Sequence, residues 1–347
     1  MQAAGQSMLR QIISQVESAN EIRALRVLHD RMPDVARDWQ RSGFDACEIL
    51  SFINQWHDQL IKRTIELTLA DLESAGRGAP PTPFCWLLLG SGGRREQTLA
   101  PDQDNALLYL EEPSDTRGET RAFFQMLAEW VVSRLAAVGY PYCPGFVMAT
   151  NPRWNGSLRE WRQAIGSYAG YPDGNNARFL AMAADMRPIC GDFRLAAELR
   201  EWFSGQVREL AFVHWQTAQH GWQQPVALDW RDRFRTEKWG DHMGELNIKE
   251  GGYLQIVNAA RLWSLAHGVH ATSTLERIAA LRDLAIWEEQ WASRVAGALR
   301  LFIHHRIWGN YVCPDRLSDT EAAALKEAMR TARHLQKRTA RRFRKPK

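Results

Sequence analysis

Two short stretches of the sequence combine residue types that can bind phosphate groups and a divalent cation. The first runs from Gly90 to Gly93 and follows the apolar run from Phe84 to Leu89, a pattern that predicts a buried strand ending in a tight turn. Glycines at such a turn let backbone N–H groups approach anionic phosphate oxygens, because no Cβ stands in the way. A helix that begins near Gly93 would add its N-terminal donors to this attraction.

The second stretch is Asp102-Gln103-Asp104. Two residues that lie two positions apart on a strand point to the same face, so both carboxylates should face one site. Two hard oxygen ligands on one face suit Mg²⁺ while it also holds triphosphate oxygens and water. Next to a phosphate-binding turn, this pair indicates metal-assisted phosphoryl or nucleotidyl transfer.

Neither stretch is specific alone. The glycine-rich turn lacks the Lys-Ser/Thr ending of a Walker loop and does not have the spacing of a dinucleotide-binding fingerprint. An Asp-x-Asp pair is often part of a turn or a helix cap. In this order and about ten residues apart, the two stretches together point to one active site.

The combined pattern resembles the signature of the DNA polymerase β-type nucleotidyltransferase superfamily. More narrowly, two runs resemble the nucleotidyltransferases described as domain of unknown function 294 (DUF294), namely Gly-Ser-x-Gly-Arg-x-Glu-Gln and Asp-Gln-Asp-Asn-Ala. That family is related to the PII-protein uridylyltransferases and the glutamine synthetase adenylyltransferases. Members often carry sensor modules upstream, which the mostly helical residues before Phe84 do not resemble.

Two further segments are similar to motifs of these relatives. The segment from Ala184 to Pro188 is similar to their Asp-x-Arg-Pro strand, and the resemblance implies that Asp185 is the third carboxylate. The segment from Asn247 to Gly252 is similar to their Asp-x-Lys-x-Gly-Gly helical segment. Two positions depart from the pattern: Arg95 stands where the relatives usually carry Gly, and Asn247 stands where they usually carry an acidic residue.

These observations assign roles to individual residues. We expect the metal, Mg²⁺ or Mn²⁺, to be held by the catalytic carboxylates Asp102, Asp104 and Asp185. We expect the nucleotide to be bound by Gly90, Ser91, Gly92, Gly93, Arg94, Arg187 and Lys249. Four of these assignments have a structural alternative: an ordinary turn for Ser91 and the glycines, an Asp185–Arg187 ion pair, an Arg94–Glu96 salt bridge, and an ordinary surface position for Lys249.

The expected reaction is attack of an acceptor hydroxyl on the α-phosphate of a nucleoside triphosphate, with pyrophosphate as the leaving group. The resemblance implies that the acceptor is a side-chain hydroxyl on a protein, as in the uridylyltransferases and adenylyltransferases. The alternatives are transfer to a small molecule, transfer to an RNA end, and a regulatory protein that senses nucleotides without catalysis. Neither the base of the nucleotide nor the acceptor can be predicted from these motifs.

The elements around the motifs predict an α+β fold, in which a small mixed-sheet nucleotidyltransferase core is flanked by N-terminal and C-terminal helical regions. We expect three domains: an N-terminal helical region and linker at residues 1–83, the nucleotidyltransferase core at 84–205, and a C-terminal helical domain with a basic tail at 206–347. The strands expected in the core are residues 84–89, 104–110, 146–149 and 183–190, and a helix is expected at 119–138.

The composition limits the class of protein and its partners. Five Cys without CxxC spacing argue against a disulfide framework, and no apolar run approaches the roughly 20 residues of a membrane span, so we expect a soluble, cytoplasmic protein with no membrane partner. Residues 326–347 contain ten Lys or Arg and one Glu, which leaves the rest of the chain at 4 − 9 = −5. This basic tail could contact nucleic acid, acidic protein or anionic lipid. The lack of a stacking platform of aromatic residues within it argues against nucleic acid.

Overall fold

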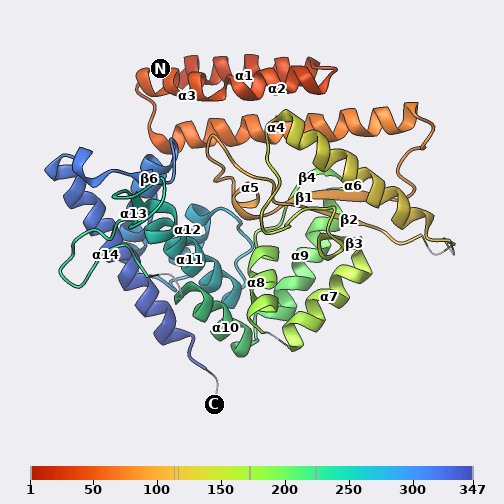
Figure 1. Cartoon of the computed structure of the whole chain (residues 1–347). Coiled ribbons are helices and arrows are strands. Elements are labelled where there is room, and N and C mark those ends of the chain that lie inside the picture. Colours follow the sequence, from red (N-terminus) through yellow and green to blue (C-terminus); the bar gives the residue numbers. More distant parts are fainter. Residues whose placement is uncertain (1, 113, 116, 172, 223–224, 346–347) are drawn as a thin grey trace. The chain divides into compact units, whose positions relative to one another are not determined.

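The computed structural model describes residues 2–112, 114–115, 117–171, 173–222 and 225–345 of the chain (Figure 1). The chain divides into two compact units. The first unit comprises Met1–Ala164 and Asp185–Trp202, and the second comprises Ile165–Ala184 and Phe203–Lys347. Within the described residues, no helix is both long and apolar enough to cross a membrane.

The first unit is built around a four-stranded mixed sheet with the order β3-β2-β1-β4. Its strands are β1 (Phe84–Leu88), β2 (Asn105–Tyr109), β3 (Asn155–Ser157) and β4 (Arg187–Gly191). Strand β1 is antiparallel to both β2 and β4, whereas β2 and β3 are parallel. Every residue of the two central strands is buried, which matches the continuous apolar runs in the sequence. The α+β prediction is therefore confirmed.

The first unit surrounds this sheet with helices, of which α4 is the longest. The helices are α1 (Gln2–Ser18), α2 (Ile22–Asp30), α3 (Met32–Arg41), α4 (Ala46–Ser74), α5 (Gly90–Arg94), α6 (Glu119–Val138), the 3₁₀ turn η1 (Pro152–Trp154), α7 (Leu158–Gly170) and α9 (Phe193–Val207), the last two of which continue into the second unit. Helix α4 begins at a capping box, in which Asp45 accepts from the backbone N–H of Glu48 and Glu48 accepts from that of Asp45. It packs against α1, α2, α3, α6 and β4 (Figure 1).

The second unit is almost entirely helical. Its elements are α8 (Gly174–Ala183), α10 (Ala211–Trp222), β5 (Leu246–Asn247), the π-helical turn η2 (Lys249–Tyr253), α11 (Leu254–Ala266), α12 (Thr274–Asp283), α13 (Glu289–Arg306), β6 (Tyr311–Val312), the 3₁₀ turn η3 (Pro314–Arg316) and α14 (Asp319–Arg342). Helix α11 is central, because α10, α12 and α14 all pack against it. A capping box of Ser318 and Glu321 begins α14.

Two of the four predicted strands are placed differently in the structure. Residues 146–149 do not form a strand, since Phe146 has a φ of 55°, which lies outside the β region, and the third strand is β3 instead. The fourth strand begins at Arg187, because the apolar residues up to Ala183 end helix α8, whose cap is Asp173. Short apolar runs fit a helix end and a buried strand equally well, which explains the second error.

Candidate active site

The glycine-rich turn and the aspartate pair meet at the ends of β1 and β2. Backbone N–H of Leu89 donates to the carbonyl of Asp104 at 2.9 Å, so the residues that follow β1 lie beside those that precede β2. Gly90 has a φ of 51°, in the left-handed region that favours glycine. A Cβ on Gly90 would lie 2.2 Å from Oδ2 of Asp104. The turn therefore needs glycine here both for its conformation and for the approach of the Asp104 carboxylate.

The short helix α5 follows directly, and it begins at Gly90 rather than near Gly93. Gly93 has a packing role, because a Cβ there would lie 1.9 Å from the backbone oxygen of Asp185. The backbone N–H of Gly93 donates to the carbonyl of Leu89 at 2.8 Å, so the N–H groups of Ser91 and Gly92 belong to the first turn of α5, whose donors have no acceptor within an α-helix. These first-turn donors are the groups that the sequence predicts for binding phosphate.

Asp102 and Asp104 come together with a residue that the sequence analysis did not select. One carboxylate oxygen of each aspartate and Sγ of Cys143 lie within 4.8 Å of one another, close enough to share a metal ion. Burial, and secondarily the charge of Asp104, raises the pKa of the Cys143 thiol to about 11. The thiol is therefore protonated at neutral pH. The two carboxylates suit Mg²⁺ or Mn²⁺, whereas a sulfur ligand suits softer ions.

The residues that alternate with the two aspartates hold the segment that carries Cys143. Gln103 and Asn105 are buried, while Asp102 and Asp104 are half-buried. The Gln103 side chain donates to the Tyr140 carbonyl at 2.9 Å, and Oδ1 of Asn105 accepts from the backbone N–H of Ala149 at 2.9 Å. The carboxylates thus face the site, and the amides fix its wall from residue 140 to residue 149.

Asp185, the predicted third carboxylate, lies in a buried ion pair. Its side chain is 0% exposed, and Oδ2 accepts from Nη1 of Arg94 at 2.6 Å. Nε of Arg94 donates to Glu96 at 2.8 Å, so the Arg94–Glu96 salt bridge that was the structural alternative does form. Among the described residues, the group that could hold a metal comprises Asp102, Asp104 and Cys143, and Asp185 is not part of it.

Arg187 connects three elements of the first unit, and its role in nucleotide binding stays a prediction. Its guanidinium donates two parallel hydrogen bonds to Asp58 of α4, at 2.7 and 2.9 Å. Nη2 also donates to the carbonyl of Gly92 in α5 at 2.8 Å. Bidentate pairs of this kind fix geometry as well as charge, so Arg187 anchors the glycine turn to α4 and β4.

Helix α4 supports the chain that follows the glycine turn. Asn54 exchanges two hydrogen bonds of 3.0 Å with the backbone of Gln97. His57 lies 3.0 Å from the carbonyl of Thr98 through Nε2 and 2.8 Å from the Tyr140 hydroxyl through Nδ1. Burial lowers the pKa of His57 to about 3, so the ring is neutral. Because a carbonyl only accepts, Nε2 carries the proton and Nδ1 accepts from the tyrosine.

These supporting residues were not selected from the sequence. Asn54, His57 and Asp58 lie three and four positions apart, so they share one face of α4. The available signal was that Asn54 and His57 stand at helical spacing among the apolar residues that α4 buries. Cys143 offered no comparable signal, because its position next to the aspartates depends on the path of the segment after α6.

The two departures from the family pattern have different structural consequences. Arg95 has a φ of 56°, which explains why glycine suits this position in relatives, and its side chain is 62% exposed. Asn247 belongs to the second unit and lies just before η2, where its Oδ1 accepts from the backbone N–H of Glu250 at 3.0 Å. Lys249 is the first residue of η2 and is half-buried, and its role in nucleotide binding stays a prediction.

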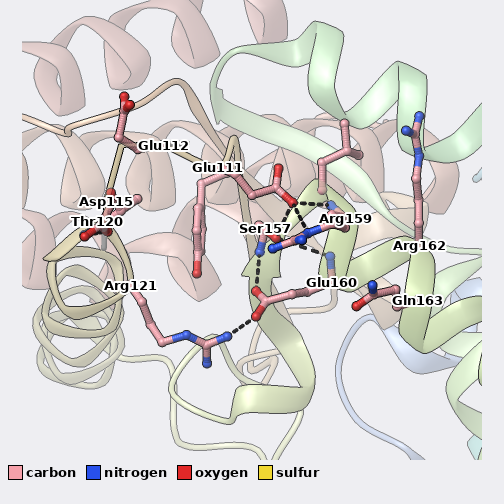
Figure 2. A pocket seen from close by; sticks show the side chains of 12 residues that line it. Glu111, Glu112, Asp115, Thr120, Arg121, Ser157, Arg159, Glu160, Arg162 and Gln163 are labelled. Atoms are coloured by element: carbon pink, nitrogen blue, oxygen red, sulfur yellow. Dashed lines mark hydrogen bonds and ion pairs between the residues drawn. The ribbon is translucent and has the colours of Figure 1, made fainter. Parts of the chain in front are cut away.

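A pocket lies at the other end of β2 (Figure 2). Its volume is about 810 Å³, and none of the predicted site residues lines it. The charged side chains around it bind one another: Glu111 accepts from Ser157 at 2.8 Å and from Arg159 at 3.2 Å, and Arg121 pairs with Glu160. These contacts join the residue after β2 to β3 and α7, and join α6 to α7, so they account for these four charges without a ligand.

Comparison with known families gives two matches along the chain. Residues 30–175 match the family described as putative nucleotidyltransferase DUF294, and residues 212–343 match the putative nucleotidyltransferase substrate binding domain that accompanies it. No curated protein matches the sequence. The first match covers the glycine turn, the aspartate pair and Cys143. With most of its length matched in the expected order, the chain belongs to the DUF294 family of nucleotidyltransferases.

Proposed function

We propose that the protein transfers a nucleoside monophosphate from a nucleoside triphosphate to an acceptor hydroxyl in a reaction that depends on Mg²⁺ or Mn²⁺. The observation that carries this proposal is the convergence of two carboxylates on the glycine turn. Asp104 approaches Gly90 so closely that a Cβ would lie 2.2 Å from its carboxylate, and Asp102 lies beside it. Family membership supports nucleotidyl transfer in general.

Asp102 and Asp104 hold the cation, and the first amides of α5 bind the phosphate oxygens. A bound divalent cation would stabilise charge on the attacking and leaving oxygens of an in-line displacement. The acceptor oxygen forms a bond to the α-phosphorus, and the bond from that phosphorus to the bridging oxygen breaks. Pyrophosphate leaves with the electron pair of the broken bond, and the acceptor proton passes to a base or to water.

For Asp185 we propose a role that acts through Arg94. The carboxylate is fully buried and bound to Arg94, which lies in α5, so it fixes the helix that presents the phosphate-binding amides. Asp185 would contact the cation as a third carboxylate only if nucleotide binding displaced it from Arg94. In this proposal, Arg94 and Arg187 contribute to nucleotide binding by fixing the conformation of the glycine turn and do not contact phosphate.

The acceptor that we propose is a side-chain hydroxyl on a protein, as the resemblance to uridylyltransferases and adenylyltransferases implies. The match of residues 212–343 to a substrate binding domain supports the second unit as the place where a substrate is recognised. A nucleotide sensor without activity is the competing function. An aspartate pair that can still share a cation favours the enzyme.

The deciding experiment incubates the protein with each labelled triphosphate, Mg²⁺ or Mn²⁺, and cell extract. A labelled protein band that requires Asp102 and Asp104 supports the proposal. The test variant is Asp102→Asn/Asp104→Asn, and the matched control is Asp34→Asn/Asp38→Asn, which removes two exposed carboxylates from α3. Label in a small molecule or in RNA would identify that molecule, and not a protein, as the acceptor. Saturable nucleotide binding without any transfer would identify a sensor and refute the proposed reaction.

A further inference from the structure

The C-terminal half of α14 and the residues after it carry positive charge without any negative charge. Residues 328–345 contain eight Lys or Arg residues and no Asp or Glu. Two of them, Arg330 and Arg333, pair with Asp232. For the other six, no carboxylate partner is recorded within the described part of the chain: Lys337, Arg338, Arg341, Arg342, Arg344 and Lys345. We call these six residues the cationic strip.

The cationic strip is open to solvent because α14 buries its other side. Leu335 and Thr339 are buried in the second unit, and Nε1 of Trp263 in α11 donates to the Thr339 hydroxyl at 3.0 Å. Five members of the strip are exposed, and Arg338 is half-buried. The helix dipole favours cations in the last turn, but Lys337 and Arg338 lie before that turn. The helix dipole therefore does not account for the positive charge at these two positions.

An aromatic pair from α10 lies beside the end of the cationic strip. Phe343 packs against His214 of α10, with 5.6 Å between ring centroids, and this contact sets the end of α14 next to α10. On the same helix, the rings of Phe212 and Trp215 lie 5.0 Å apart, and Phe212 is 40% exposed. Nζ of Lys345 lies 5.4 Å from the Trp215 ring. The fold thus supplies the aromatic residues that the tail lacks in sequence.

We propose that this surface binds single-stranded nucleic acid, with phosphates on the cationic strip and a base stacked on Phe212. A strip of cations that forms no ion pair within the described residues is complementary to a phosphate backbone, and an exposed aromatic ring beside it can stack on any base. An acidic protein would also be complementary to the positive charge, but its binding would not require stacking on the Phe212 ring. The surface lies wholly in the second unit, and binding to it does not depend on the proposed transfer reaction.

The test measures binding of labelled mixed-sequence single-stranded RNA and DNA by fluorescence anisotropy, without nucleoside triphosphate, from 50 to 200 mM salt. If all six cations each neutralise one phosphate, the slope of log K against log salt is about −4, and the affinity falls about 300-fold across that range. Arg341→Glu/Arg342→Glu should weaken binding and bring the slope to about −3. Phe212→Ala should weaken binding by about 5- to 150-fold without changing the slope.

The matched control is Arg294→Glu/Arg300→Glu, which makes the same change in net charge at exposed positions of α13. The control should bind like the wild type. An equal loss of affinity in both double variants would mean that binding is general electrostatic attraction, which would overturn the proposal. The absence of binding at 50 mM salt would also overturn it. Equally tight binding of poly-glutamate, unaffected by Phe212→Ala, would identify an acidic protein partner instead. Arg341→Gln/Arg342→Gln repeats the test if the glutamate variant does not fold.

Discussion

Replacing Gly90 with alanine tests the central geometric claim, which is that the glycine turn and Asp104 must touch. The substitution has two effects. A left-handed φ of 51° becomes unfavourable by about 1–2 kcal/mol for a residue with a Cβ. The new Cβ would also lie 2.2 Å from Oδ2 of Asp104, whereas ordinary contact begins near 3.4 Å. The carboxylate must therefore move by about 3.4 − 2.2 = 1.2 Å.

Gly76→Ala isolates the first effect. Gly76 has a φ of 72°, and nothing lies within 4 Å of the position that its Cβ would take. Gly76→Ala should lose about 1–2 kcal/mol of unfolding free energy, measured by urea denaturation, and Gly90→Ala should lose at least as much because the clash with Asp104 adds to the backbone cost. Only Gly90→Ala should disturb the cation site, because Mg²⁺ requires ligands at about 2.0–2.1 Å in near-octahedral geometry. A displacement of this size can reduce a reaction rate by about 100-fold.

The assay is Mn²⁺ binding, followed by the loss of the electron paramagnetic resonance signal of the free ion, because it needs no knowledge of the acceptor. We expect Gly90→Ala to weaken Mn²⁺ binding at least tenfold, and Gly76→Ala to bind like the wild type. Nucleotidyl transfer, once the acceptor is known, should follow the same order. If Gly90→Ala binds Mn²⁺ with wild-type affinity, the aspartates do not hold the cation in the way that the structure implies.

Three further outcomes are expected from the same unit. Cys143→Ser should weaken binding of the soft ion Cd²⁺ much more than that of Mn²⁺, as measured by competition titration, and equal losses would exclude sulfur as a ligand. Arg94→Met should lower the unfolding free energy by about 3–5 kcal/mol because it removes the buried guanidinium that binds both Asp185 and Glu96. Arg95→Gly should be neutral or stabilise by up to about 1 kcal/mol, and both variants are measured by urea denaturation. Burial lowers the pKa of His57 to about 3, so between pH 6.5 and pH 3 the unfolded state binds more protons than the folded state. The free energy of unfolding therefore decreases as the pH decreases through that window. Between pH 7 and pH 5 this group lowers the unfolding free energy of the wild type by about 2 kcal/mol. The decrease measured for His57→Asn over the same range should be smaller by that amount. An equal decrease in both proteins would mean that the buried ring titrates normally.

How much the sequence predicts depends on how local the interaction is. The strand, the turn after it and the aspartate pair lie within 21 residues, and periodicity with residue chemistry was enough to place them. The partner of Asp185 was not predictable in this way, because Arg94 lies 91 positions earlier in the chain. The interpretation that paired Arg187 with Asp185 used the nearest charge on the strand, but Arg187 binds Asp58, 129 positions away. Long-range partners of buried charges are set by packing, which sequence spacing does not encode.

The short helix α5 explains how a carboxylate outside the metal cluster can still belong to the site. Its five residues span only about 7.5 Å at 1.5 Å per residue. At its first residue, Gly90 touches Asp104, and at its fourth, Gly93 touches the backbone of Asp185. Both aspartates are therefore fixed to one helical turn. For Asp185 to bind a cation, its carboxylate must give up the 2.6 Å hydrogen bond to Arg94. Loss of activity in Asp185→Asn would fit both roles, whereas loss of Mn²⁺ affinity in a variant that remains as stable as the wild type would fit only direct ligation.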